Sequence, residues 1–308
     1  MDKKSIIPFL AMPLMLIVVE IGALALSPLM QAAGISAFED PTSVANPFIF
    51  IVILLVFTGF LLLLIKFGFK RIISFVIGAS IFFTFIYIFS AIVFAVVGTT
   101  DTAVLLVFAC SVGATLLLFK YPEWYIIDVL GVLIAAGVAS IFGRSLDILP
   151  VVILLIILAV YDAVSVYRTK HMITLAEGVI DLKTPILFVI PKKRNYSFIR
   201  EGIGRLAEGG ERAAFVMGMG DLIMPSILVV SANVFLKEGT RILGFVIKGT
   251  RIFGFINLPA LGAIVGSLAG LVVLLHFVSS GRPQAGLPPL NGGTLIGFAV
   301  GLGLSTFL

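Results

Sequence analysis

Long apolar runs, separated by short polar or charged breaks, dominate the pattern along the chain. A membrane-spanning helix needs about 20 mostly apolar residues, and nine segments reach roughly that length. They run over residues 5–31, 46–65, 72–98, 102–119, 122–142, 148–167, 212–236, 253–278 and 289–308. The pattern therefore predicts an all-α polytopic membrane protein with nine transmembrane helices.

One long hydrophilic stretch, residues 168–211, interrupts this series and separates six spans from three. The interruption predicts three parts. Residues 1–167 form a six-helix N-terminal membrane part, residues 168–211 form a hydrophilic loop, and residues 212–308 form a three-helix C-terminal membrane part.

The composition agrees with lipid as the solvent. Hydrophobic residues make up 60% of the 308 residues and charged residues only 12%, about half the share of a typical soluble domain. The mean hydropathy is +1.21. Such a chain cannot cover itself with polar groups in water, and it is too apolar to be disordered.

The distribution of positive charge predicts the orientation, because cytoplasmic loops of membrane proteins collect Lys and Arg. With a cytoplasmic N-terminus, 16 of the 21 Lys and Arg fall on the cytoplasmic side and 5 on the outer side. The N-terminus and the 168–211 loop are thus predicted to be cytoplasmic, and the C-terminus to lie outside. Four of the five outer charges surround a tandem repeat of Gly-Thr-Arg-Ile that begins at Gly239 and Gly249, to which we assign no function.

Carboxylates inside the predicted spans are the candidate functional groups, since a charged residue in a membrane is costly and marks function by default. Three lie within spans and a fourth lies nearer the interface: Glu20, Asp162, Asp221 and Asp128. At 1.5 Å per residue, Asp162 lies about 9 Å from the charged edge at Arg168, and Asp221 about 13 Å from the edge at Arg212. Because the sixth and seventh spans run in opposite directions, Asp162 and Asp221 are predicted at a similar depth near one membrane face.

Two chemistries fit such a pair. Facing carboxylates in a low-dielectric site cannot both ionise easily, so they share a proton. The ionised member can activate water as a general base while the protonated member polarises a peptide carbonyl, which is aspartic-protease chemistry. A secondary transporter or cation leak channel could use the same groups, and Glu20 would suit an ion pathway. Gly218 and Gly220 favour the protease, because they permit the backbone to unwind beside a water-filled cavity.

Three motifs carry a family resemblance. Tyr161-Asp162 in the sixth span and Gly218-Met219-Gly220-Asp221 in the seventh resemble the paired motifs of the presenilin and signal peptide peptidase family of intramembrane aspartyl proteases, of the GxGD type. The third family motif, Pro-Ala-Leu, opens the ninth span. Leu287-Pro288-Pro289-Leu290 stands in that place here, with Pro289 instead of Ala, whereas a literal Pro259-Ala260-Leu261 opens the eighth span.

The resemblance implies a role for each motif. The catalytic dyad would be Asp162 and Asp221, the residues that shape the site would be Tyr161, Gly218, Met219 and Gly220, and those that position the unwound substrate would be Pro288, Pro289 and Leu290. The implied reaction is hydrolysis of peptide bonds within the transmembrane segments of single-span membrane proteins or their remnant peptides, with no cofactor. The chain looks like a microbial, archaeal presenilin homologue that works in the lipid bilayer without obligatory accessory subunits, and a homo-oligomer is compatible with it.

Other features were weighed against this interpretation. The apolar stretch from Thr184 to Ile190 could offer a strand edge to an extended substrate, or could pack on the bundle as an interfacial segment. The two histidines, His171 and His276, form no His-Glu-x-x-His motif, so a zinc protease is excluded and no metal site is predicted. The basic loop is predicted to face anionic lipid headgroups rather than nucleic acid.

Overall fold

The computed structural model describes most of the chain. The described ranges are residues 3–169, 187–193, 195–202, 214–237, 239–242, 245–246, 251–252, 254–278 and 284–307. The helices before the central gap are α1 (Lys3–Ala32), α2 (Ala45–Lys66), α3 (Lys70–Val97), α4 (Asp101–Lys120), α5 (Trp124–Ser145) and α6 (Ile148–Val164), with the π-helical turn η1 (Ser165–Thr169). The later helices are α8 (Phe198–Glu201), α9 (Met219–Phe235), α10 (Leu258–Val278) and α11 (Leu287–Phe307).

The described residues also include six short strands. Strand β1 (Leu187–Pro191) pairs antiparallel with β2 (Ala214–Gly218), in a register that places Val189 opposite Val216. The other strands form two minimal pairs, β3 (Arg241–Ile242) with β4 (Phe245–Val246) and β5 (Arg251–Ile252) with β6 (Ile256–Asn257). Each copy of the tandem repeat thus contributes its Arg-Ile pair to a small antiparallel strand pair, although the two pairs differ in register.

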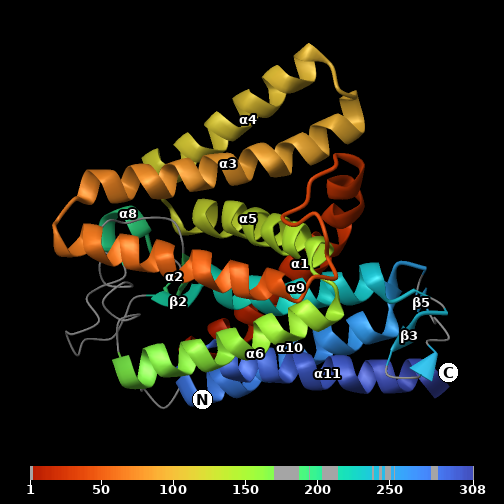
Figure 1. Ribbon diagram of the computed structural model, residues 1–308. Coiled ribbons are helices and arrows are strands. Elements are labelled where there is room, and N and C mark those ends of the chain that lie inside the picture. The colour runs from red at the N-terminus through yellow and green to blue at the C-terminus, as the bar shows by residue number, and fades with distance from the viewer. Residues whose placement is uncertain are drawn as a thin grey trace.

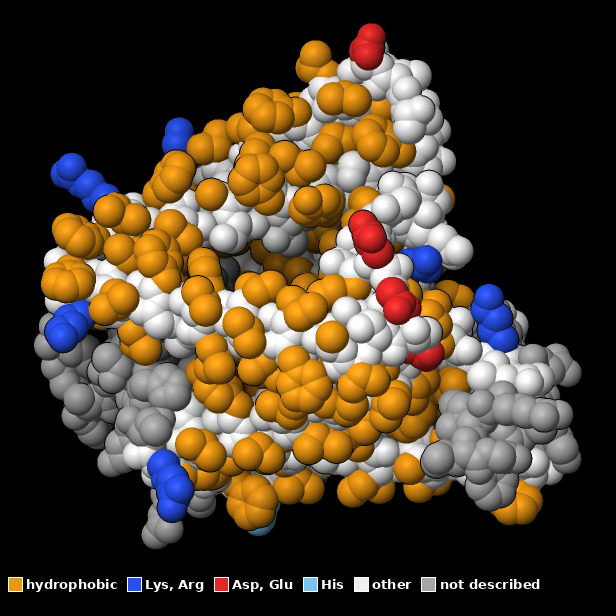
Figure 2. Space-filling model, viewed as in Figure 1, with side chains coloured by type: hydrophobic (Ala, Val, Ile, Leu, Met, Phe, Trp, Pro, Cys, Tyr) orange, Lys and Arg blue, Asp and Glu red, His pale blue; other side chains and the backbone are white. Residues whose placement is uncertain are grey.

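Among the described residues, eight helices are long and apolar enough to cross a membrane: α1 to α5, α10, α11, and α6 with the turn that follows it. Helix α9 is apolar but has only 17 residues. Figure 2 shows hydrophobic side chains covering the flank of the bundle, with the charged side chains gathered toward its two ends. This distribution is the one that a hydrocarbon layer around the middle of the bundle requires.

The centre of the bundle is α5, which packs against both α1 and α9. Helices α3 and α4 form a hairpin at one edge, and α10 and α11 lie together at the opposite edge (Figure 1). Helix α6 lies beside α9 and α11. The two helices that carry Asp162 and Asp221 are thus neighbours, although a central loop separates them in the sequence.

Glycines bring α10 and α11 unusually close. On each helix they recur at every fourth position, so they line one face: Gly262, Gly266 and Gly270 on α10, and Gly293, Gly297 and Gly301 on α11. A Cβ atom added at Gly266 would collide with the Gly293 carbonyl oxygen. Such small-residue faces let membrane helices pack backbone to backbone.

The seventh predicted span differs from the structure. Residues 212–236 were expected to form one helix, but residues 214–218 form strand β2 and the helix begins only at Met219. The stretch Ala-Phe-Val-Met-Gly is apolar, so hydropathy merges it with the helix that follows. Its backbone hydrogen bonds go instead to β1, a segment far away in the sequence. The eighth span likewise begins at Leu258, after β6, rather than at residue 253.

Candidate active site

Asp162 lies in the last turn of α6 and is buried, with 6% of its surface exposed. Helix α6 is an apolar run that Asp147 caps, because its carboxylate accepts the backbone N–H of Ile148 at 2.7 Å. Three residues after Asp162 the helix widens into the π-helical turn η1, a distortion that is frequent at functional sites. The Ser165 hydroxyl donates to the Asp162 carbonyl oxygen at 2.9 Å and holds this turn.

Asp221 lies in the first turn of α9, three residues after the N-cap residue Gly218. The backbone of Gly218 hydrogen-bonds to the Asp221 carboxylate, which is the contact that the third residue of a capping box makes. The Gly-x-Gly-Asp string is therefore the junction between strand β2 and helix α9. The predicted location of Asp221 well inside a helix is wrong in this respect.

The loop before α11 joins the two carboxylates. The backbone N–H of Leu287 donates to Oδ2 of Asp162 at 3.0 Å. A Cβ atom added at Gly286 would lie 2.9 Å from Oδ2 and 3.0 Å from Oδ1 of Asp221, so this carboxylate lies directly against Gly286. Two adjacent residues thus contact the two carboxylates, which also interact electrostatically with each other. The structure therefore brings Asp162 and Asp221 together, as the antiparallel spans predicted.

Tyr167 anchors the same loop from the turn that follows Asp162. Its hydroxyl donates to Oε1 of Gln284 at 2.9 Å and accepts the backbone N–H of Ala285 at 3.3 Å. Sequence reasoning missed Tyr167, Gly286 and Leu287. Gly286 adjoins the recognised Leu-Pro-Pro-Leu string and could have been found, whereas Leu287 acts through a backbone N–H that any residue except proline supplies.

The proline motif opens α11. Pro288 and Pro289 occupy its first turn, where helix N–H groups have no intrahelical partner and proline is tolerated. Leu290 is fully buried. The carbonyl of Pro289 lies against Gly270 near the end of α10, while Pro259 at the start of α10 packs on Gly301. The literal Pro259-Ala260-Leu261 string therefore lies at the opposite end of the α10–α11 pair from Pro288.

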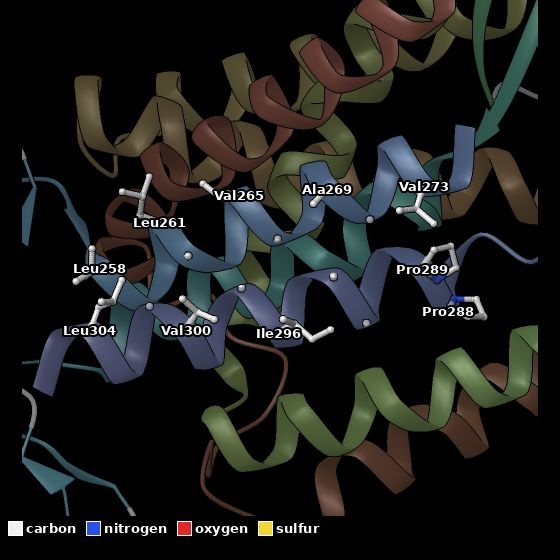
Figure 3. A pocket seen from close by; sticks show the side chains of 17 residues that line it. Leu258, Leu261, Val265, Ala269, Val273, Pro288, Pro289, Ile296, Val300 and Leu304 are labelled. Carbon is white, nitrogen blue, oxygen red and sulfur yellow. The ribbon is translucent and has the colours of Figure 1, made fainter. Parts of the chain in front are cut away.

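An apolar groove of about 710 Å³ follows the outer side of the α10–α11 pair (Figure 3). Pro288 and Pro289 line one end of this groove, and Leu258 and Leu304 line the other end. The residues that line it are apolar, and neither Asp162 nor Asp221 is among them. We assign the groove no chemistry.

The remaining predicted residues contribute in different ways. Tyr161 hydrogen-bonds to Thr58 of α2, which ties α6 to that helix. Met219 is buried, and its methyl group lies against Gly131 of α5. Gly220 is exposed, and a Cβ atom added there would meet nothing within 4 Å. The space in front of Gly220 is therefore open.

Glu20 belongs to a different contact. It is fully buried in α1, and its Oε1 lies 2.7 Å from the hydroxyl of Ser267 on α10, which donates to it. The carboxylate thus links α1 to α10. No group of three His, Cys, Asp or Glu that could hold a metal occurs in the described part of the chain. His171 lies outside the described residues, and His276 lies in the last turn of α10.

The helical bundle and the two carboxylates that meet beside a loop define a membrane-embedded aspartic protease. The family model described as signal-peptide peptidase, presenilin aspartyl protease matches residues 13–306. This chain therefore belongs to the signal peptide peptidase and presenilin family of aspartyl proteases, and it is an integral, multi-pass membrane protein.

Two solved structures of relatives agree. A presenilin family intramembrane aspartate protease, solved in a P2 space group, is 51% identical, with a TM-score of 0.69 over 96% of this chain and 98% of that chain. A second structure of a presenilin family intramembrane aspartate protease, in a C222 space group, is 49% identical, with a TM-score of 0.70 over 96% and 99%. No curated protein matches the chain. The predicted activity of an intramembrane aspartic endopeptidase is confirmed, and nothing favours the transporter alternative.

Proposed function

We propose that Asp162 and Asp221 are the catalytic dyad of this intramembrane protease. The observation that carries the proposal is that both carboxylates contact one two-residue segment, Gly286–Leu287, and interact electrostatically with each other. The ionised carboxylate takes a proton from a water molecule as that water attacks the peptide carbonyl carbon. The protonated carboxylate donates its proton toward the carbonyl oxygen, and the nitrogen of the cleaved bond leaves as an amine after it is protonated.

The backbone N–H of Leu287 has a defined part in this scheme. It occupies Oδ2 of Asp162 and thereby orients the carboxyl group. The backbone of Gly286 also hydrogen-bonds to the Asp162 carboxylate, so two adjacent residues of the loop hold this group in place for the water or the substrate. The motif that follows supports this role, because Pro288, Pro289 and Leu290 make the first turn of α11 rigid. This rigid turn fixes the position of the Leu287 N–H relative to Asp162.

We propose that the extended substrate pairs with β2 rather than with the 184–190 stretch. The N–H of Val189 in β1 points away from β2, because it donates to Oδ1 of Asp128 at 2.9 Å. In an antiparallel pair the hydrogen-bonding direction alternates along each strand. Phe188 and Ile190 therefore bond to β2, and the outward edge of β1 faces α5. In the middle of β2 the residue whose backbone points outward is Val216. The outward edge of β2 runs along the chain toward Asp221.

The finer topology is also proposed. Helix α9 serves as the seventh of nine spans, since β2 brings the chain to the membrane depth at which α9 begins. The N-terminus and the 168–211 loop lie in the cytoplasm and the C-terminus outside. In support, acidic side chains gather at the end of the bundle that carries the α1–α2 and α3–α4 connections (Figure 2). Lys66, Lys70 and Arg71 lie at the α2–α3 connection at the other end.

The substrates are proposed to be single-span membrane proteins or their remnant peptides, with the N-terminus outside. Both carboxylates and the loop that contacts them come from one chain, so no accessory subunit is needed to complete the site. This chain is proposed to act without cofactor, either alone or as a homo-oligomer.

One experiment tests the dyad. The purified protein, reconstituted in liposomes with a single-span substrate, is compared with Asp162→Ala and Asp221→Ala and with the control Asp101→Ala. Asp101 is an exposed carboxylate in the first turn of α4. The wild type and the control are expected to release two fragments, and both dyad variants none, as measured by mass spectrometry. Cleavage by either dyad variant contradicts the assignment.

A further inference from the structure

The first helical turns of α5 hold the chain that enters the active site at three points. Glu123, which precedes the helix, binds the start of α8; Asp128 binds β1; and Gly131 receives Phe188 and Met219. These contacts lie along the cytoplasmic part of one helix. On the α5 side, Glu123, Asp128 and Gly131 belong to none of the motifs that the resemblance assigns.

The central contact is the hydrogen bond from the N–H of Val189 to Oδ1 of Asp128, at 2.9 Å. Strand β1 would otherwise present this donor as an unpaired edge group. Asp128 is partly buried, so the bond forms away from bulk water, where an unmade hydrogen bond costs more. The bond fixes which edge of β1 faces α5 and, through the register with β2, which edge of β2 faces outward.

One turn further along α5, Gly131 has no side chain. Met219 and Phe188 occupy the space that a side chain would take there. A Cβ atom added at Gly131 would lie 2.7 Å from the methyl carbon of Met219 and 3.0 Å from the ring of Phe188. Met219 is two residues before Asp221, and Phe188 is the residue before Val189. Asp128 and Gly131 therefore contact β1 and the first residue of α9, which directly follows β2 and lies next to the proposed catalytic carboxylate.

A second carboxylate holds the far end of the same segment. Oε1 of Glu123 accepts the Ser197 hydroxyl at 2.7 Å, and Oε2 accepts the N–H of Phe198 at 3.1 Å. The buried Tyr196 donates to the Gly202 carbonyl oxygen at 2.8 Å. Burial, together with the negative charges of Glu201 and Glu123, raises the pKa of Tyr196 to about 12, so its hydroxyl remains a donor.

We propose that Asp128 is a positioning residue for the protease reaction, which acts by holding the β1–β2 hairpin so that the outer edge of β2 guides the substrate to the dyad. The argument rests on the proposed dyad and on the proposed pairing with β2. It predicts that Asp128 influences which peptide bond is cut, because a one-residue slip in strand pairing reverses the faces of the paired strand. A residue that serves stability alone does not have this effect.

The test compares four forms in liposomes: wild type, Asp128→Ala, Asp128→Asn and the control Asp101→Ala. The asparagine side chain keeps a carbonyl oxygen where Asp128 has its acceptor, but it carries no charge. Each form is assayed with one single-span substrate for kcat, KM and the masses of all fragments. The folded fraction of each form is measured by gel filtration and thermal unfolding.

Asp128→Ala is expected to lower kcat about 10-fold or more per folded molecule, and to add fragments from neighbouring peptide bonds. The loss in Asp128→Ala is expected because misplacement by roughly 1 Å already costs about 100-fold in a reaction of this kind. Asp128→Asn keeps the acceptor and is therefore expected to give the wild-type fragments, with kcat within about 3-fold of the wild type. A single unchanged cleavage site at wild-type kcat in Asp128→Ala overturns the proposal. So does an Asp128→Asn variant that is as impaired as Asp128→Ala, or a loss of activity that only follows the loss of folded protein.

The same assay separates this proposal from the assignment of the dyad. If Asp162→Ala and Asp221→Ala are inactive while Asp128→Ala is indistinguishable from wild type, only the positioning role fails. If the dyad variants still cleave, the assignment of the active site fails whatever Asp128→Ala does.

Discussion

The backbone N–H of Leu287 donates a hydrogen bond to Oδ2 of Asp162 at 3.0 Å, across 125 residues of sequence. This bond ties the head of α11 to the end of α6. The preceding residue, Gly286, lies against the Asp221 carboxylate on α9. Three helices that are separate in the sequence therefore converge on two residues, and the geometry of the site depends on that loop as much as on the carboxylates.

Gly286→Ala is expected to reduce kcat by about 100-fold while the protein stays folded. The new methyl group would lie within 3.0 Å of the Asp221 carboxylate, so the carboxylate must shift, and a shift of about 1 Å is enough for such a loss. Gly292→Ala, on the helix α11 that follows, is the control, because a Cβ atom there meets nothing within 4 Å. Single-turnover cleavage measures both, and equal rates in the two variants would falsify the close packing of Gly286 on Asp221.

Val216→Pro is expected to weaken cleavage without unfolding the hairpin. Proline removes the outward N–H of β2, which the proposed substrate strand needs, and it is tolerated at a strand edge whose N–H faces outward. Met217→Pro is the matched comparison. Its N–H points toward β1, so that substitution is expected to disrupt the β1–β2 pairing itself. Val216→Pro is expected to raise KM and to keep the Ile190 amide protected from hydrogen exchange, whereas Met217→Pro is expected to lose that protection. An unchanged KM in Val216→Pro contradicts pairing of the substrate along β2.

The dependence of kcat/KM on pH is expected to be bell-shaped. When both carboxylates are protonated no general base exists, so activity rises with pH as the first proton leaves the pair. When both are ionised no acid remains to polarise the peptide carbonyl, so activity falls again. The profile is measured in liposomes equilibrated on both sides, with the wild type and Asp101→Ala. A rate that stays constant through the acidic range contradicts a shared proton.

Gly266→Ala is expected to destabilise the protein by about 1–3 kcal/mol, the usual cost of overpacking. Its Cβ atom would meet the Gly293 carbonyl oxygen of α11, a backbone atom that cannot move aside. At Gly303, also on α11, a Cβ atom meets nothing within 4 Å. Gly303→Ala is therefore expected to be neutral or slightly stabilising, because alanine favours a helix by up to about 1 kcal/mol over glycine. Thermal unfolding in detergent distinguishes the two variants.

The sequence by itself determined most of the helices that are long enough to span the membrane, and it singled out two carboxylates that the fold brings together. Apolar runs of about 20 residues have one favourable state in lipid, a helix that satisfies its own backbone hydrogen bonds. The helical locations expected from residues 46–65 and 102–119 accordingly agree with α2 and α4 to within a few residues. Asp162 and Asp221 stood out because charge is scarce in such runs, and opposite helix directions brought them to one face.

Only the tertiary structure decided that residues 214–218 form a strand, that Leu287 and Gly286 complete the site, and that Asp128 holds the hairpin. The apolar composition of residues 214–218 suits a helix and a strand equally, and the pairing with β1 across the central loop settles the choice. Leu287 acts through its N–H and Gly286 through the absence of a side chain. The sequence places both residues at the proline motif, but it does not show that either one meets a carboxylate until the fold brings Asp162 and Asp221 beside them.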